Sequence, residues 1–202
     1  MAKLLVIDNY DSFTYNLVQM FMNYDLSIEV CRSDKISLDG VKTINPDYVL
    51  ISPGPKGPSH SGISIPLIKF LSGKVPIFGV CLGAQCINEA FGGSTVRSPI
   101  PVHGKVGMVY HNNDGIFMGL PSPFAAARYH SLMIKISSRE LIINSQTSDG
   151  VIMGLSHHKF PIHGVQFHPE SFLTENGFLL VENFLRLGLL AKKKSCLSCN
   201  PV

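Results

Sequence analysis

Charged residues are scarce in this sequence, and their scarcity limits the kind of protein it encodes. Asp, Glu, Lys and Arg make up only 15% of the 202 residues, whereas hydrophobic residues make up 45%. A chain of this length and composition can bury a sizeable core and is unlike a disordered or fibrous protein. The net charge is only +3, and three lysines stand together at positions 192–194. Because no basic stripe with interleaved aromatic residues remains elsewhere, we expect no nucleic-acid partner.

Long apolar runs and a regular cysteine framework are also missing. Only four apolar residues separate Lys3 from Asp8, too few for the core of a signal peptide, and no later run is long enough to cross a bilayer. Five cysteines without framework spacing fit a reducing compartment better than a secreted disulfide scaffold. We therefore expect a cytoplasmic protein that does not associate with membranes.

The first half of the chain alternates apolar strands with helices. The pattern predicts strands at 3–7, 27–31, 48–51 and 76–80, and helices at 13–24 and 63–71. This order is typical of an α/β fold with an open, mostly parallel sheet covered by helices on both faces. The loops at 8–12 and 52–58 and the turn at Cys81 should then meet at one edge of the sheet, where such folds bind ligands.

The second half has a different pattern. From about 94 to 167, short apolar segments separated by Gly, Pro, Asn and Asp predict a β-rich region, and a last helix is expected at 176–190. Without an internal repeat or an interdomain linker, we predict one domain at 1–190 and a basic, cysteine-containing tail at 191–202. Cys196 and Cys199 have half the spacing of a zinc site but no second ligand pair. Cys199 is fourth from the end, but Asn200 and Pro201 do not suit prenylation.

Cys81 is the first candidate for chemistry. A buried strand ends at this residue and a glycine-bearing helix begins directly after it, the layout that hydrolases use to hold a nucleophile on a sharp turn. The positive end of the helix dipole also favours a thiolate at that position. The alternative interpretation is a buried structural cysteine, as most free cysteines are.

His168 and Glu170 favour the catalytic interpretation. Side chains at i and i+2 of an extended segment leave the same face, so this histidine and this glutamate can lie side by side. One ring nitrogen can then face Cys81 while the other donates to the Glu170 carboxylate. Together the three residues supply a nucleophile, its base and a group that orients the base.

His157 and His158 suggest a metal site at first sight. Adjacent residues of a strand point to opposite faces, and no cysteine or carboxylate cluster accompanies the pair. We therefore expect no metal in the chain.

The chain resembles the class I, triad-type glutamine amidotransferases, and within them the small subunits of anthranilate synthase and aminodeoxychorismate synthase. Five ordered segments carry the resemblance: 8–17 (DNYDSFTYNL), 52–55 (SPGP), 79–85 (GVCLGAQ), 128–132 (RYHSL) and 164–171 (GVQFHPES). The resemblance implies a flavodoxin-like α/β fold and a partner subunit that binds chorismate. It implies no cofactor in this chain and assigns any magnesium requirement to the partner subunit.

The resemblance also implies roles for individual residues. Cys81 would attack the side-chain amide of L-glutamine, and His168 would give a proton to the departing ammonia. The N–H groups of Gly54 and Leu82 would form an oxyanion hole. Glutamine would be bound by Gly54 and Pro55, by Gln85, and by the main chain of Ser131 and Leu132.

Two positions depart from the family pattern, and alternative functions remain. Lys56 stands where relatives often have Gly or Cys, and Ala84 replaces a larger residue beside the turn glycine. One alternative is a freestanding cysteine hydrolase acting on γ-glutamyl compounds or peptides, and another is a binding module without turnover. The first would not be expected to carry the segments at 9–12 and 129–132, and the intact Cys81, His168 and Glu170 disfavour the second. Anthranilate and aminodeoxychorismate both remain open as products.

Overall fold

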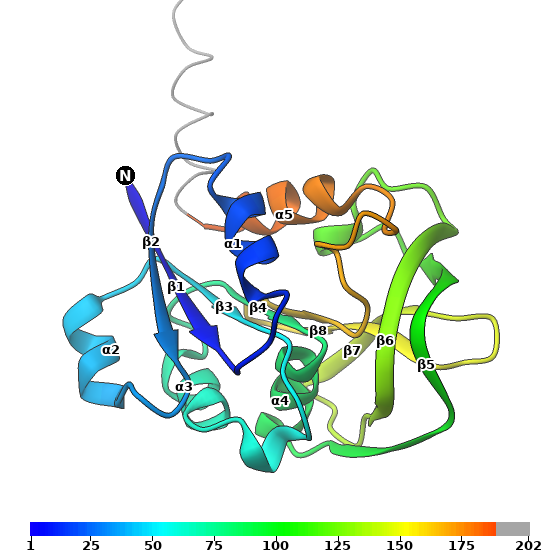
Figure 1. The fold of residues 1–202 in the computed structure, drawn as a ribbon, viewed down its shortest axis with the longest axis horizontal. Coiled ribbons are helices and arrows are strands. Elements are labelled where there is room, and N and C mark those ends of the chain that lie inside the picture. Colours follow the sequence, from blue (N-terminus) through cyan, green and yellow to red (C-terminus); the bar gives the residue numbers. More distant parts are fainter. Residues whose placement is uncertain (189–202) are drawn as a thin grey trace, which may run out of the picture.

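The computed structural model describes residues 1–188, so the tail predicted at 191–202 lies outside the described part of the chain. Within these residues one sheet of nine strands has the order β2-β1-β3-β4-β9-β8-β7-β5-β6 (Figure 1). The sheet is parallel at one end and antiparallel at the other. This mixed sheet with helices agrees with the predicted α/β fold and its β-rich second half.

The parallel part contains β2 (Leu26–Arg32), β1 (Ala2–Asp8), β3 (Tyr48–Ile51), β4 (Ile77–Val80) and β9 (Ile162–Val165), each parallel to its neighbour. Every residue of β3, β4 and β9 is buried. Strands covered on both faces are apolar throughout, which is why these segments read as continuous apolar runs.

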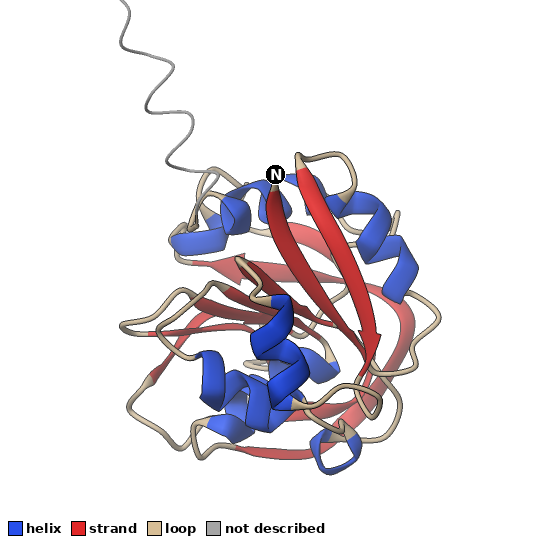
Figure 2. Cartoon of the chain, turned by 90° about the vertical axis from the view of Figure 1, so that its left-hand side faces the viewer, coloured by secondary structure: helices blue, strands red, loops and turns tan. Residues whose placement is uncertain are grey.

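Helices cover both faces of this sheet (Figures 1 and 2). Helices α1 (Thr14–Phe21) and α5 (Gly177–Leu185) pack in one core with Leu4 and Val6 of β1. Helices α2 (Leu38–Ile44), α3 (Ser64–Leu71) and α4 (Leu82–Ala90) pack in the other core with the alternate β1 residues, Leu5 and Ile7. The period-two alternation of a strand thus divides β1 between two cores.

The antiparallel part follows β9 with β8 (Ile152–His157), β7 (Leu141–Gln146), β5 (Ser94–His111) and β6 (Phe124–Lys135). Strands β5 and β6 form a long two-stranded ribbon beside the rest of the sheet (Figure 1). An isolated bridge between Ala127 of β6 and His168 ties the ribbon to the segment that follows β9.

Most predicted elements are confirmed, with differences at their ends. The first helix, expected to reach residue 24, ends at Phe21, because residues 22–24 turn back through bonds such as Tyr24 N–H to Phe21 C=O. The last helix ends at Leu185 and not at 190. Helix α2 was not expected, and the Ser37 side chain caps it by accepting from the Gly40 N–H. None of the described helices is long and apolar enough to cross a bilayer.

Candidate active site

Cys81 occupies a strained turn between β4 and α4. Its φ of 53° and ψ of −102° lie outside the regions that residues with side chains prefer, which typically costs about 1–3 kcal/mol. The Cys81 N–H donates to the Val165 carbonyl of β9 at 2.8 Å, which holds the turn against the sheet. The side chain is almost buried, and its sulfur faces a cavity.

Two glycines allow α4 to begin this close to the sheet. A Cβ added at Gly83 would collide with the carbonyl oxygen of Ile51, at the end of β3. A Cβ at Gly79 would lie 2.5 Å from the carbonyl group of Gly83. The spacing Gly-x-Cys-x-Gly therefore has a steric reason, since backbone must pass close to backbone on both sides of the cysteine.

The predicted histidine–glutamate pair is present and almost fully buried. His168 Nδ1 and Glu170 Oε1 are 2.5 Å apart, with the two side chains 4% and 0% exposed. His168 Nε2 has no partner of hydrogen-bond geometry among the described residues, and an interaction of the ring with Cys81 raises the pKa of His168. One nitrogen is thus held by a carboxylate, and the other is left for the nucleophile.

The charge on the ring follows from opposing effects. Burial by itself lowers the pKa of His168, but the interactions with Cys81 and Glu170 outweigh burial and raise the pKa to about 10. The ring is therefore a cation at neutral pH. Phe13 and Tyr129 enclose it edge-on, with ring centroids 5.9 and 5.1 Å from that of the imidazole.

Gln166 also belongs to the site, a position that was not predicted from the sequence. Its Nε2 donates to the Cys81 sulfur at 3.5 Å, and its Oε1 accepts from Gln85 Nε2 at 3.1 Å. Gln166 precedes His168 by two residues, so the i, i+2 argument that joined His168 to Glu170 could have found it.

The three loops predicted to meet at the sheet edge do so. The Asn9 N–H donates to Ser52 Oγ at 2.9 Å, and Asn9 Nδ2 donates to the Ser52 carbonyl at 3.1 Å. These bonds join the loop after β1 to the loop after β3. A Cβ added at Gly54 would lie 2.6 Å from both Asn9 Cβ and Leu82 Cδ2, so only glycine fits between the loop and the start of α4.

A cavity of about 170 Å³ collects the remaining predicted residues around Cys81. It is lined by Gly54, Pro55, Lys56, Cys81, Leu82, Gln85, Tyr129, His130, Ser131 and Leu132. Every residue predicted to form an oxyanion hole or to bind glutamine is in this lining. The first N–H groups of a helix have no acceptor inside the helix, so α4 can offer donors to a bound molecule.

His130 fixes the main chain on the far side of the cavity. Its Nδ1 bonds to the Leu132 carbonyl at 2.9 Å, and its Nε2 accepts from Arg128 Nε at 3.2 Å. Because Arg128 can only donate, the proton of the neutral ring is on Nδ1, where it holds Leu132 in place. These two hydrogen bonds indicate that Arg128 and His130 position the main chain at Leu132.

The two departures from the family pattern have local structural consequences. Lys56 adopts a φ of 63°, a left-handed conformation that glycine adopts without steric cost. Lys56 is exposed and lines the cavity. Ala84 is buried against β9, and a Cβ added at Gly164 would lie 2.9 Å from the Ala84 Cβ. Neither position is one of the three predicted catalytic residues.

The prediction that the His157 and His158 side chains point to opposite faces of a strand was wrong. Their rings stack with centroids 4.9 Å apart instead of pointing to opposite faces, because β8 ends at His157 and a turn begins at His158. His157 Nδ1 accepts from the N–H groups of Lys159 and Phe160 at 3.0 and 3.1 Å, which is a structural role. In the described part of the chain, no group of three or more His, Cys, Asp and Glu side chains is arranged to hold a metal ion.

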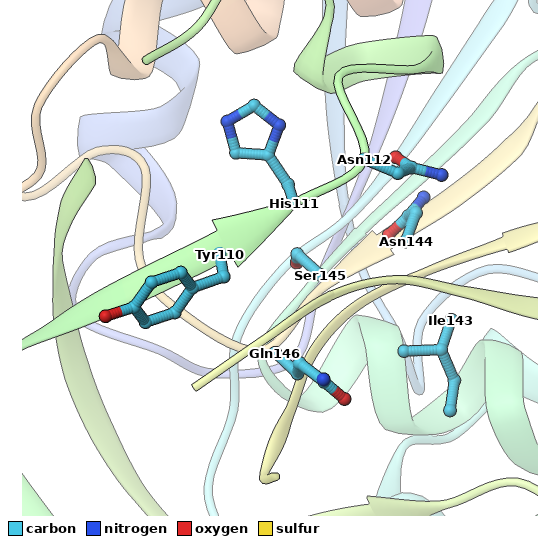
Figure 3. A pocket seen from close by; sticks show the side chains of 7 residues that line it. All are labelled: Tyr110, His111, Asn112, Ile143, Asn144, Ser145 and Gln146. Atoms are coloured by element: carbon cyan, nitrogen blue, oxygen red, sulfur yellow. The ribbon is translucent and has the colours of Figure 1, made fainter. Parts of the chain in front are cut away.

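A second hollow lies where β5 meets β7 (Figure 3). Its volume is about 430 Å³, and it is lined by Tyr110, His111, Asn112, Ile143, Asn144, Ser145 and Gln146. None of these seven side chains is a thiol or a carboxylate. We therefore place the candidate chemistry at Cys81 and not here.

Comparisons with known proteins agree with this geometry. The family model described as "Glutamine amidotransferase class-I" matches residues 5–187. The chain is 47% identical to anthranilate synthase component 2 of Thermus thermophilus over 91% of both proteins. It is 46% identical to the aminodeoxychorismate/anthranilate synthase component 2 of Bacillus subtilis, over 90% of this chain and 95% of that protein.

A solved structure is similar over nearly the whole fold. It is described as one of the subunits of GMP synthase from Thermoplasma acidophilum, with a TM-score of 0.84, 24% identity and 98% of both chains covered. At 24% identity, the similarity supports only a shared fold. The match to the family model covers most of the chain, and the chain belongs to the class-I glutamine amidotransferases.

Proposed function

We propose that this chain is the glutaminase subunit of a chorismate-using synthase, with Cys81, His168 and Glu170 as its catalytic triad. The observation that carries the proposal is the strained Cys81, which interacts with a cationic His168 and lines the cavity. The Cys81 thiolate attacks the amide carbon of L-glutamine, and His168 protonates the departing ammonia. Water then hydrolyses the glutamyl thioester, with His168 accepting its proton, and releases glutamate.

The cavity lining supplies the remaining roles. The N–H groups of Gly54 and Leu82 stabilise the oxyanion, each contributing about 3 kcal/mol to lowering the barrier. Gln85, Pro55 and the main chain of Ser131 and Leu132 bind the amino-acid end of glutamine. Side chains and N–H groups suffice for these steps, so we propose no cofactor in this chain and assign any magnesium requirement to the partner.

The partner is inferred from the relatives. Two of them are named as component 2 of anthranilate synthase or of aminodeoxychorismate/anthranilate synthase, and each is covered over at least nine-tenths of its length. We propose that ammonia passes to a chorismate-binding subunit that makes anthranilate, 4-amino-4-deoxychorismate or both. A reducing compartment such as the cytoplasm would keep Cys81 reduced and able to form the thiolate.

The proposal is tested by mixing the chain with the chorismate-binding subunit of each synthase, chorismate and glutamine. The product is then identified by chromatography and mass. Anthranilate or aminodeoxychorismate should form only when both subunits are present. Steady glutamate release with neither product from either subunit would instead favour a freestanding hydrolase acting on γ-glutamyl compounds.

We expect the isolated chain to hydrolyse glutamine slowly and to accelerate when its partner binds chorismate. The cavity around Cys81 has a volume of about 170 Å³, which suits a small amide, and turnover without the partner's acceptor would only consume glutamine. Glutamate release is measured with the chain alone, with partner, and with partner plus chorismate. Equal rates in all three mixtures would contradict the expectation.

Gly54→Ala should lower the turnover number at least tenfold, because the new Cβ would overlap Asn9 and Leu82 and displace an oxyanion donor. Gly57→Ala is the matched control in the same loop. Its Cβ would meet only Leu132 Cδ1, at 3.4 Å, and its φ of −149° suits alanine. The measurement is glutaminase activity of both variants in the assembled complex, and equal activities would remove the Gly54 N–H from the mechanism.

A further inference from the structure

The outer face of helix α1 has an unusual composition. Its exposed residues are Tyr15, Asn16 and Gln19, and exposed Met22 and Asn23 continue the stripe just beyond the helix. No charged residue occurs between Ser12 and Tyr24. The other described α-helices each carry at least one charged side chain. Helix faces that stay in water normally carry charges, whereas faces buried by a partner lose them.

Phe172 lies beside this face and is 93% exposed. A phenylalanine held almost wholly in water is unfavourable unless a partner covers it. It stands at the tip of a tight turn, in which the Thr174 N–H donates to the Ser171 carbonyl and the Leu173 N–H donates to Ser171 Oγ. The turn therefore presents the ring on a fixed support.

A groove of about 540 Å³ joins the helix face to this turn. Its lining is Asn16, Gln19, Met20, Asn23, Pro169, Glu170, Ser171, Phe172, Thr174, Gly177 and Phe178. Glu170 is the only ionisable residue among them, and its side chain is fully buried against His168. A partner can therefore cover the groove without stripping water from an exposed charge.

The groove is also connected to the candidate triad. Thr174 Oγ1 donates to the His168 carbonyl at 2.6 Å and accepts from the Ala127 N–H at 2.9 Å. The His168 N–H donates in turn to the Ala127 carbonyl at 3.0 Å. The turn that carries Phe172 is thus hydrogen-bonded to the backbone of the catalytic histidine. A protein bound to the turn can therefore affect the position of His168.

We propose that the chorismate-binding subunit docks on this surface, formed by the exposed face of α1 and the groove-lining residues of the turn 169–178, with Phe172 as its anchor. The exposed Glu175 belongs to the same turn but does not line the groove, and its carboxylate accepts from the Ala125 N–H at 3.1 Å. This inference rests on the proposed function. The fitting partner surface is apolar and uncharged, with a pocket for one aromatic ring. Continuity with the triad favours the synthase subunit. The chain's own lysine-rich segment at 192–194 would find no exposed acid among the groove residues to pair with.

The test compares three variants of the full-length chain for affinity to the synthase subunit that forms product with the wild type. Phe172→Ser and Gln19→Lys should each raise the dissociation constant at least tenfold. The first removes the anchor, and the second places a charge in the groove. Ile143→Ser is the matched control, since Ile143 is an exposed aliphatic residue at the separate hollow between β5 and β7 (Figure 3). Its affinity should stay within twofold of wild type.

Unchanged affinity of Phe172→Ser, or equal weakening by Ile143→Ser, would overturn the proposed surface. If the wild type binds no chorismate-binding subunit, the proposed function fails and the surface assignment fails with it. A photoreactive benzophenone side chain in place of Phe172 should crosslink to the synthase subunit in the complex. Crosslinking instead to a second copy of the chain, or to residues 189–202 of the same chain, would show a different occupant and contradict the inference.

Discussion

Cys81→Ser should reduce glutamine-dependent synthesis by the complex at least about a thousandfold while leaving synthesis from added ammonium salts nearly intact. The serine hydroxyl is almost wholly protonated at neutral pH. His168 is placed to serve a thiolate and is a poor match for activating a hydroxyl. Amination takes place on the partner, which needs only ammonia. Product formation is measured with glutamine and with ammonium chloride as alternative nitrogen sources.

Cys86→Ala is the matched control for this experiment. Cys86 lies in α4, five residues after Cys81. Burial raises the pKa of its thiol to about 12, although an interaction with Ser61 opposes that shift. It is therefore protonated and should be dispensable for turnover. Glutamine-dependent activity in Cys81→Ser, or failure of ammonia to replace glutamine in an assembled complex, would refute the proposed mechanism.

Glu170→Gln should lower the turnover number by a factor on the order of 10² to 10⁴, with a smaller effect on glutamine binding. The amide neither stabilises the imidazolium nor enforces the tautomer that leaves Nε2 for the sulfur. Glu182→Gln, at a surface glutamate paired with Arg186, is the control and should keep wild-type turnover. A turnover number of Glu170→Gln within twofold of wild type would remove Glu170 from the mechanism.

The same substitution has a spectroscopic signature. Burial lowers the pKa of His168, and Cys81 and Glu170 together raise it to about 10, so loss of the carboxylate should move the pKa downward. Because the folded pKa is above the ordinary value of about 6.5, this group stabilises the fold fully below pH 6.5. That stabilisation is lost as pH rises through about 10. Ring resonances of His168 in labelled protein report both pKa values, and an unchanged pKa in the variant would contradict the assignment.

The sequence predicted the parallel half of the fold well because buried strands and their turns have strong local signals. Tyr48–Ile51 was predicted to the residue, since four buried apolar residues stand between Asp47 and the Pro-Gly loop. Helix α2 was missed because only Val41 of its seven residues is buried, which leaves little apolar periodicity to detect. The left-handed conformation of Lys56 could not be predicted, because lysine carries no local signal for it, whereas a glycine at this position would have indicated it.

The candidate site was predictable to the extent that its residues stand in ordered segments of the chain. The gathering of Gly54, Gln85, Ser131 and Leu132 around Cys81 follows from the resemblance, since they come from separate segments. The hydrogen bond from Gln166 to the sulfur depends on the distance between β9 and α4, which no single segment fixes. The stacking of His157 on His158 depends on where β8 ends, and strand ends are the least certain part of a sequence prediction.

The most direct test of Cys81 as the nucleophile is to trap the covalent intermediate. The complex is mixed with glutamine and chorismate and quenched in acid within milliseconds. The chain is then digested, and its peptides are weighed by mass spectrometry. We predict a glutamyl group that fragment spectra place on Cys81, with none on Cys86 of the same peptide and none on the peptide that contains Cys31. A glutamyl group on any other residue, or its persistence in Cys81→Ser at the wild-type level, would contradict nucleophilic attack by Cys81.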